Sequence, residues 1–288
     1  MEVEKAARVI QTQSPSLYLA LTHHKTHRGH DLDFRDHPAL KQLYLDQAEY
    51  IVSMKSTQCG VSEWLLVQAL GEALRGRSVF YVLPTFQLSS RFVKNRYDRS
   101  VAWTPFYQRL DSQNEYQKSK SMTLKHFGDG AIAFVGSNSS AVFGEFPADT
   151  LIVDELDYCD QQNIEMGWER LSASESKRQA KISNPTIEGR GIDVEYANSS
   201  RYRWHIQCDA CGHWFNPDFF RHVGELIEEG VFRVYDAEGY EDPEGDARLV
   251  CDKCGKPVDR KKPGEWIAED PSNPKHGYHI SKLFTTNV

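Results

Sequence analysis

Four groups of residues in this 288-residue chain have types and spacings suited to chemistry, and the first is Lys55-Ser-Thr-Gln-Cys-Gly-Val-Ser62. Gly60 and Ser62 hold their places in the phosphate-binding pattern G-x-x-x-x-G-K-[ST], whereas Val61 replaces its lysine and Lys55 stands at its first glycine. A lysine at the loop entrance can fold back over the same phosphates, and a following helix N-terminus favours anions. The segment predicts a phosphate site, although an ordinary strand-to-helix loop also fits this pattern alone.

The second group is a pair of carboxylates, Asp154 and Glu155, which directly follow the apolar run 151–153. Nucleotide hydrolysis needs one acid to hold Mg²⁺ and another to orient and deprotonate the attacking water. Asp154 suits the first role and Glu155 the second. The alternative is that the pair caps the next helix.

The third group, Ser183-Asn184-Pro185-Thr186, ends the next predicted strand, 180–183. Its hydroxyl and amide groups could sense the γ-phosphate and pass its loss to moving parts. By itself the tetrapeptide is only a turn, so its interest lies in its position.

The fourth group consists of two C-x-x-C pairs, Cys208 with Cys211 and Cys251 with Cys254, separated by 39 residues. In a reducing compartment such pairs indicate a metal site before disulfides. Four thiolates suit tetrahedral Zn²⁺, and a closed site of this kind is structural. Gly212 and Gly255 follow the pairs and permit tight turns. An iron site and two unrelated pairs remain alternatives.

Alternating strands and helices would position these groups. Period and composition predict strands at 50–55, 78–83, 151–153 and 180–183, helices at 62–75 and 87–100, and a hairpin over 122–135. In the second helix Leu88, Phe92 and Val93 are expected to face inward. This order predicts an α/β fold with a parallel sheet, in which ligands bind at the carboxyl ends of the strands. Each of the first three groups falls at such an end.

Composition and charge bound the organisation. Net charge is −7, but residues 75–125 carry ten basic and three acidic residues, so a basic face on an acidic body could grip a phosphate backbone. A merely solvated basic surface is the alternative. The chain lacks an apolar run of membrane-spanning length and an apolar signal core, so we expect a soluble, intracellular protein.

The chain divides into four expected parts. Residues 1–45, which are rich in histidine, form a solvated lead-in segment. Residues 46–200 form a P-loop ATPase core, 201–262 a zinc-ribbon subdomain with an acidic insertion, and 263–288 a return segment.

Taken together, these groups resemble the ATPase domain of a tailed-phage terminase large subunit of the lambda-type branch. The matching residues are Lys55–Glu63, Tyr81–Pro84, Gly136–Ser140, Leu151–Asp157, Ser183–Thr186, both cysteine pairs and Gly277–Phe284. The resemblance covers about residues 30 to 285 and implies a RecA-like P-loop sheet. It further implies a motor that pumps double-stranded viral DNA into a procapsid.

The resemblance also implies roles for single residues. The ATP-binding residues would be Lys55, Ser56, Thr57, Gln58, Cys59, Gly60, Val61, Ser62 and Glu63, with Gln47 as an adenine contact. Ser62 and Asp154 would support Mg²⁺, Lys55 and Glu155 would be catalytic, and Ser183, Asn184, Pro185 and Thr186 would form the coupling motif. The expected cofactors are ATP, Mg²⁺ and Zn²⁺.

Two departures qualify this resemblance. Members often carry an arginine before the acidic strand, where this chain has Gly144-Glu-Phe146. The charge-stabilising arginine would come from a neighbouring subunit or from Arg91, Arg96 or Arg170. The family's nuclease domain would follow beyond this chain, so nuclease activity is not expected here.

The expected partners are double-stranded DNA, the small terminase subunit and the portal of the procapsid, in the host cell cytoplasm and without a membrane. A homo-oligomeric ring is expected for the working motor, whereas the isolated domain could be a monomer. Two other functions compete: a DEAD-like helicase ATPase, and a non-enzymatic zinc-ribbon adaptor on a degenerate P-loop fold. A helicase needs a second motor lobe, and the intact acidic pair argues against decay.

Overall fold

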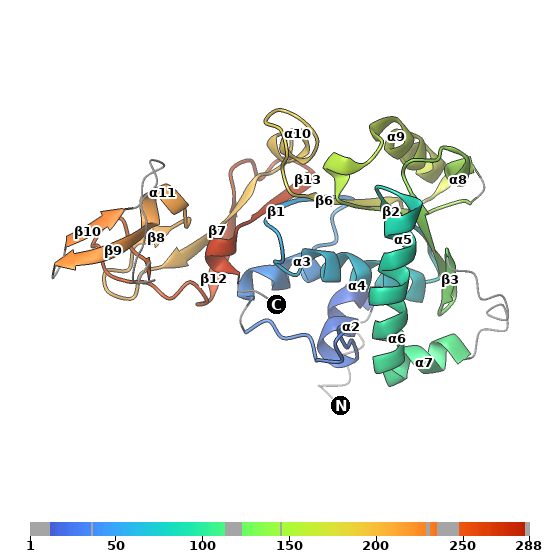
Figure 1. The fold of residues 1–288 in the computed structure, drawn as a ribbon, viewed down its shortest axis with the longest axis horizontal. Helices are drawn as coiled ribbons and strands as arrows, with labels where there is room; N and C mark the ends of the chain where they lie inside the picture. Colours follow the sequence, from blue (N-terminus) through green and yellow to red (C-terminus); the bar gives the residue numbers. More distant parts are fainter. Residues whose placement is uncertain are drawn as a thin grey trace.

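The computed structural model describes residues 12–35, 37–112, 123–144, 146–228, 231–234 and 248–285. In this part of the chain a central β-sheet carries helices on both faces, and a smaller lobe extends from one end of the sheet (Figure 1). Every helix among these residues is too short or too polar to cross a membrane.

The central sheet is mostly parallel, as expected from the sequence. In spatial order its strands are β12 (Gly264–Ala268), β7 (Tyr202–Gln207), β13 (Lys275–Ile280), β1 (Tyr50–Lys55), β6 (Arg178–Ser183), β5 (Thr150–Asp154), β2 (Ser78–Leu83), β4 (Gly130–Gly136) and β3 (Leu124–Phe127). Neighbours from β7 to β4 are parallel, whereas the edge strands β12 and β3 pair antiparallel. The hairpin expected over 122–135 is the pair β3–β4.

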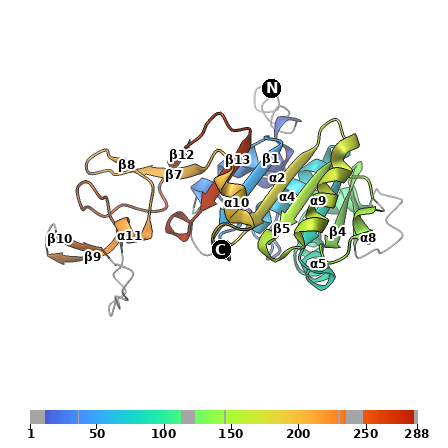
Figure 2. The same cartoon turned by 90° about the horizontal axis from the view of Figure 1, so that it is seen from above.

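Both faces of the sheet are buried. Along β2, Val79 and Tyr81 join one hydrophobic cluster, whereas Phe80 and Val82 join the other, as strand alternation requires. Helices α4 (Val61–Leu74), α2 (Pro15–Thr22) and α3 (Lys41–Leu45) cover the first face (Figures 1 and 2). Helices α8 (Ala141–Gly144), α9 (Gln161–Glu169) and α10 (Ile192–Ala197) cover the second. Burial on both faces explains why the central strands β2 and β5 are nearly continuous apolar runs.

The N-terminal region is not the solvated lead-in expected from its polar composition. Leu19 and Leu43 are fully buried, and α2 packs on the outer side of α4. A Cβ at Gly71 of α4 would lie 2.9 Å from the backbone nitrogen of Ser16, so a glycine is needed for this close approach. The described part of this region, with the short 3₁₀ helix Pro38–Leu40, therefore completes the first layer of the core.

The helix expected over 87–100 is confirmed in position, with an irregular middle. It consists of α5 (Phe86–Phe92), a π-helical turn (Val93–Tyr97) and α6 (Asp98–Trp103), followed by α7 (Pro105–Ser112). The Thr85 Oγ1 accepts a hydrogen bond from the Leu88 backbone N–H and begins the helix. Val93 is buried, but Leu88 is 42% exposed, so its predicted inward orientation is wrong.

The C-terminal part does not separate from the core where the sequence predicted. Strands β7 and β12 pair with each other, and β13 lies between β7 and β1, so residues on both sides of the expected boundaries belong to the central sheet. The remaining elements form the smaller lobe. They are β8 (Trp214–Phe215), α11 (Phe219–His222), β9 (Val223–Glu228), β10 (Val231–Val234) and β11 (Arg248–Leu249). β8 also pairs with β7, which joins the lobe to the sheet.

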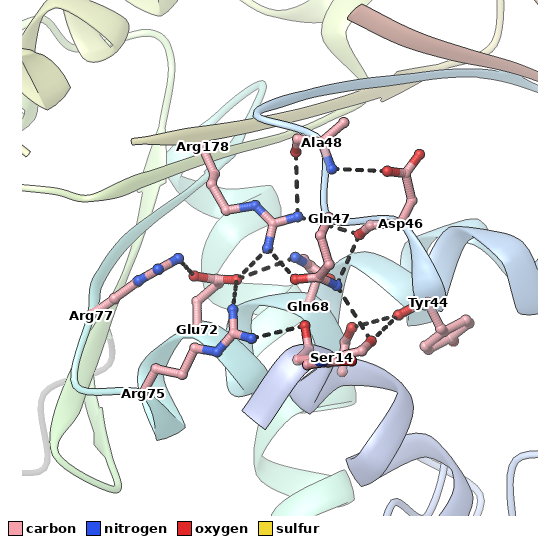
Figure 3. A network of polar contacts seen from close by, with 12 residues as sticks. Ser14, Tyr44, Asp46, Gln47, Ala48, Gln68, Glu72, Arg75, Arg77 and Arg178 are labelled. Atoms are coloured by element: carbon pink, nitrogen blue, oxygen red, sulfur yellow. Dashed lines mark hydrogen bonds and ion pairs between the residues drawn. The ribbon is translucent and has the colours of Figure 1, made fainter. Parts of the chain in front are cut away.

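A buried network of charges fixes the C-terminal end of α4 (Figure 3). The Glu72 side chain, which is 2% exposed, pairs with Arg178 at 2.8 Å and with Arg77 and Arg75. Arg178 also donates to the backbone oxygens of Asp46 and Ala48, before β1. Glu72 thus holds the end of α4 to Arg178 at the start of β6, and Arg178 extends the network to the residues before β1.

Candidate functional site

The first three sequence groups meet at one edge of the sheet. In the parallel register, Met54 of β1 lies opposite Ser183 of β6, and Ile182 of β6 lies opposite Asp154 of β5. The three strands are neighbours and end together. Polar residues that are distant in sequence are thereby placed around the loop between β1 and α4.

The loop itself, residues 56–60, bends sharply before α4 begins at Val61. Gln58 has φ 54° and Gly60 has φ 82°, and the first of these is an uncommon conformation for a residue with a side chain. The Ser56 backbone N–H donates to the Ile280 oxygen at 2.9 Å, and the Cys59 thiol donates to the Ser56 oxygen at 3.0 Å. The loop is therefore anchored to β13 and presents the N-terminus of a 14-residue helix.

Lys55, at the end of β1, contacts residues that follow the ends of β5 and β6. Its Nζ donates to Glu155 Oε1 at 2.9 Å and to Asn184 Oδ1 at 3.4 Å, and its side chain is only 6% exposed. The Glu155 side chain is 35% exposed and its backbone is left-handed, with φ 62°. Such a conformation at a non-glycine residue is held by its surroundings and is typical of functional sites.

Asp154 is buried beneath this pair. One carboxylate oxygen accepts from Tyr81 OH at 3.1 Å, and the other lies 3.4 Å from Ser62 Oγ. Burial, followed by the neighbouring Glu155 carboxylate, raises the pKa of Asp154 to about 6. A hydroxyl and a carboxylate with converging oxygens are ligands that Mg²⁺ accepts, so the residues present fit that ion.

The tetrapeptide 183–186 lies against the turn that carries Glu155. The buried Ser183 Oγ accepts from the Asp157 backbone N–H at 3.2 Å, and the backbone N–H and Oγ1 of Thr186 both donate to Asp157 Oδ2 at 2.9 Å. Asn184 contacts Lys55. The sequence placed this segment at the site but did not identify Asp157 as its partner.

Of two further residues expected in the ATP-binding set, Gln47 lies away from the loop and Glu63 lies beside it. Gln47 precedes β1 at its amino end, one six-residue strand or about 20 Å from Lys55, and accepts from Arg178 at 3.1 Å. Glu63 is buried in α4, where its carboxylate oxygens accept from His24 at 2.8 Å and Arg96 at 2.9 Å. Gln47 is exposed and bonds Arg178 away from the loop, whereas Glu63 lines the cavity that adjoins Gln58 and Gly60.

A cavity of about 480 Å³ adjoins the loop at Gln58 and Gly60. Its walls come from the N-terminal region and include the rings of Phe34 and Tyr44, which contact each other edge to face. This wall was not predicted from the sequence, because residues 1–45 were expected to form a solvated segment. Of the arginines considered for charge stabilisation, Arg96 borders the cavity and pairs with Glu63.

The four cysteines of the smaller lobe converge. Their sulfur atoms all lie within 4.8 Å of one another, with Cys208 and Cys254 at 3.6 Å and Cys211 and Cys251 at 3.8 Å. Tetrahedral thiolates at about 2.3 Å from Zn²⁺ would be about 3.8 Å apart, so the arrangement fits that ion.

The two cysteine pairs have the same backbone geometry. The Gly212 N–H donates to the Cys208 oxygen at 2.9 Å, and the Gly255 N–H donates to the Cys251 oxygen at 2.8 Å. Both glycines have positive φ, 71° and 67°, which the tight turn requires. The sequence predicted these turns from the glycine after each pair.

Tyr81 is a further residue at the site; the sequence identified it only as the start of the matching segment Tyr81–Pro84, without a role. It lies inside the apolar run 78–83, where nothing distinguishes a tyrosine that bonds a carboxylate from one that only fills the core. In the sequence, Asp157 is visible as the third acidic residue after the apolar run 151–153. The residues that it bonds, Thr186 and Ile192, lie about thirty residues later, so the sequence does not indicate them.

The fold and the sequence can both be compared with known proteins. No curated protein matches. Among solved structures, the Thermus phage P74-26 large terminase ATPase domain has 12% identity and a TM-score of 0.46, over 85% of this chain and 80% of that one. The large terminase from a thermophilic bacteriophage has 13% identity and a TM-score of 0.37, over 64% of this chain and 42% of that one.

The family assignment rests on a match over most of the length. The family described as phage terminase large subunit gpA, ATPase domain, matches residues 39–269, which include the loop, both acidic residues, the tetrapeptide and all four converging cysteines. The chain therefore belongs to the family of phage terminase large-subunit ATPase domains.

Proposed function

We propose that this domain hydrolyses ATP and uses the cycle to move double-stranded DNA into a viral procapsid. The observation that carries the proposal is the contact of Lys55 with both Glu155 and Asn184 beside the loop that begins α4. A cation, a carboxylate and an amide meet there at the start of a helix that favours anions. Family membership supports the same function at the coarse level.

The proposed mechanism begins with phosphate binding. The backbone N–H groups of residues 57–62 and the Lys55 ammonium would bind the phosphates, and the cavity beside Gln58 and Gly60 offers space for the rest of the nucleotide. Ser62 and Asp154 would hold Mg²⁺, which when bound neutralises charge on the phosphate oxygens. Lys55 would exchange Glu155 for phosphate, which leaves the partly exposed Glu155 carboxylate free to accept a proton from water.

DNA contact is proposed for the outer side of α5, the π-helical turn and α6. Val93 and Tyr97 face the core, whereas Arg91, Lys94 and Arg99 are exposed. These cations supply a stripe that could bind phosphates without reading sequence. As in the family resemblance, the small terminase subunit, the portal and a ring of copies in the host cell cytoplasm are the proposed partners and setting.

The four converging cysteines are proposed to hold one structural Zn²⁺. All four positions of a tetrahedral ion would be filled by Cys208, Cys211, Cys251 and Cys254, so no position remains for a substrate. Metal analysis of the purified chain should find one zinc per chain. A Cys211→Ser/Cys254→Ser variant with undiminished zinc content would contradict the assignment.

The deciding experiment is ATP turnover by the purified chain, with and without double-stranded DNA, with Glu155→Gln as the blank. The variant keeps the shape of Glu155 but cannot act as a base, so nucleotide binding should remain and turnover should fall by about 100-fold or more. Stimulation by duplex DNA would support the packaging motor. Equal turnover by wild type and variant would remove Glu155 from the mechanism, and no turnover by either would leave the adaptor interpretation.

A further inference from the structure

The Asp157 carboxylate binds two residues that lie 29 and 35 residues later in the chain. Oδ2 accepts from the backbone N–H and the Oγ1 of Thr186, both at 2.9 Å, and Oδ1 accepts from the backbone N–H of Ile192 at 2.8 Å. The Asp157 N–H donates to Ser183 Oγ at 3.2 Å. Asp157 therefore joins the turn after β5 to the tetrapeptide after β6 and to the start of α10.

The backbone of the partner segment is shaped around this carboxylate. Gly191 has φ 55°, and a Cβ at this position would overlap the Asp157 carboxylate. From α10 the contacts continue, because Glu195 pairs with Lys181 of β6 at 2.6 Å and with Lys275 of β13 at 2.7 Å. The segment held by Asp157 is thus itself attached to two strands of the central sheet.

Lys55 makes a second link between the same two regions, since its Nζ contacts Glu155 on one and Asn184 on the other. The two links differ in what a nucleotide would do to them. A phosphate competes with Glu155 for the Lys55 ammonium, whereas the Asp157 bonds use backbone N–H groups that no ligand at the loop would need.

We propose that Asp157 is a positioning residue that ties the Glu155 turn to the tetrapeptide 183–186 and to α10, so that the two regions move as one when Lys55 releases Glu155. This rests on the proposed ATP hydrolysis. Asp157 contacts neither the loop nor Lys55 in any recorded bond of the described residues, so it acts through Glu155 and Asn184.

The test compares Asp157→Asn with Asp193→Asn. Asparagine keeps the size of aspartate but has only one side-chain oxygen, so it cannot accept from both Thr186 and Ile192 as the two carboxylate oxygens do. Asp193 is a matched control on the first turn of α10, where its carboxylate accepts the Gly189 N–H at 2.7 Å and no second hydrogen bond from the described residues. A third variant, Thr186→Val, removes one donor, and Thr186→Ser restores it.

Two measurements separate positioning from hydrolysis. Amide hydrogen exchange at positions 186 and 192 needs no activity and should accelerate about tenfold or more in Asp157→Asn, but not in Asp193→Asn. Single-turnover ATP hydrolysis should fall by about tenfold to a hundredfold in Asp157→Asn, with the Kd for ADP within about twofold of wild type. The hydrolysis rate of Thr186→Val should lie between those of Asp157→Asn and wild type, and the rate of Thr186→Ser should match wild type.

The outcomes are distinct. Exchange that is unchanged in Asp157→Asn overturns the link, whether or not the chain hydrolyses ATP. Faster exchange with hydrolysis equal to that of Asp193→Asn overturns the positioning role, and so does a loss of ADP binding or of thermal stability that matches the loss of hydrolysis. If the wild type hydrolyses no ATP, the proposed function fails separately, and the exchange result alone decides the link.

Discussion

At the scale of single residues, Asp154 is a carboxyl group whose surroundings disfavour its ionised form. Its carboxylate is 3% exposed and lies beside a second carboxylate, with Tyr81 and Ser62 as its side-chain partners. Burial dominates, and the pKa of Asp154 rises to about 6. A divalent cation bound beside Asp154 would replace this repulsion with attraction.

This raised pKa predicts a specific pH dependence of stability. The unfolded chain ionises Asp154 near the ordinary value of 3.8, whereas the folded chain does so near pH 6. Between these values the unfolded state loses its proton first, so the free energy of unfolding falls as pH rises and levels off above about pH 6. The full cost is about 3 kcal/mol at most, at about 1.4 kcal/mol per pH unit.

Asp154→Asn removes this cost, so its stability relative to wild type should grow from pH 4.5 to 6.5 and then stay constant. Urea unfolding of both proteins without divalent cations measures this difference. Adding Mg²⁺ at pH 7.5 should shrink the difference, because the ion stabilises the wild-type carboxylate. A difference that is independent of pH would contradict the burial argument.

What the sequence could show at this scale depended on the neighbours of each residue. The positions of Lys55, Asp154 and Glu155 at strand ends were predictable, because each charged residue comes at the end of a mostly apolar run. The bond from Tyr81 to Asp154 was not predictable, because it depends on β2 and β5 being adjacent. The bond of Glu63 with His24 was not predictable either, because the position of Glu63 after Ser62 does not reveal which side chains the helix brings it against.

At the scale of elements, the charge network around Glu72 decides how α4 is fixed at the end away from the loop (Figure 3). Helix α4 is buried along nearly its whole length, so hydrophobic contacts alone would permit it to slide along the sheet. Glu72 pairs with Arg178 of β6, and Arg75 donates to the backbone oxygens of Thr12 and Gln13 before α2. The network sets the position of the helix whose other end follows the loop 56–60.

Glu72→Ala should therefore be strongly destabilising. It leaves the mostly buried Arg178 guanidinium, 10% exposed, without its carboxylate, and breaking a buried pair in this way costs about 3–5 kcal/mol. Glu49→Ala is the matched control, because Glu49 pairs with Lys177 at 3.6 Å and both side chains are 44% exposed. That exposed pair should contribute about 0–1 kcal/mol. Equal losses in chemical denaturation of the two variants would show that the Glu72 network does not fix α4.

Strands were the most predictable elements, and the reason is their burial. A strand covered on both faces is an uninterrupted apolar run, so 50–55 and 78–83 were predicted with the bounds of β1 and β2. The N-terminal helices were missed, because α2 and α3 each bury only a few apolar residues within a polar, histidine-rich sequence. Short elements of this kind are stabilised by tertiary packing, which local periodicity does not report.

At the scale of the whole molecule, the central sheet joins the two ends of the chain. β13 pairs with β1 along six residues, from Tyr50 opposite Lys275 to Lys55 opposite Ile280. Tyr278 OH and His276 Nδ1 also bond the Asp46 carboxylate, at 2.6 and 2.7 Å. A return segment was predictable from the sequence, but its insertion beside β1 was not, because pairing across more than 200 residues leaves no local signal.

This topology gives a prediction about where the molecule can be cut. The smaller lobe leaves the sheet through the antiparallel pair β7–β12, in which Ile206 lies opposite Gly264. Replacing residues 207–263 with an Asn-Gly turn would close this pair as a hairpin, since that dipeptide suits a two-residue connection. This excised protein, which lacks residues 207–263, should keep a cooperative unfolding transition and bind ADP, because the loop, β1 and β13 are unchanged.

A chain that ends at Ser200 should behave in the opposite way, although it contains the whole stretch from 46 to 200 that the sequence suggested as the core. It loses β13, so β1, a strand from the centre of the sheet, becomes an edge strand with unpaired backbone groups. Such an exposed edge can pair with other copies of the chain. We expect this fragment to aggregate or to unfold without a cooperative transition, as measured by sedimentation and urea denaturation. If the fragment stays monomeric and binds ADP as tightly as the excised protein, β13 is dispensable and the ATPase core ends before the smaller lobe. If only the excised protein folds, the nucleotide site depends on a strand from the far end of the chain, and the anchoring of Ser56 to Ile280 is the contact that makes it so.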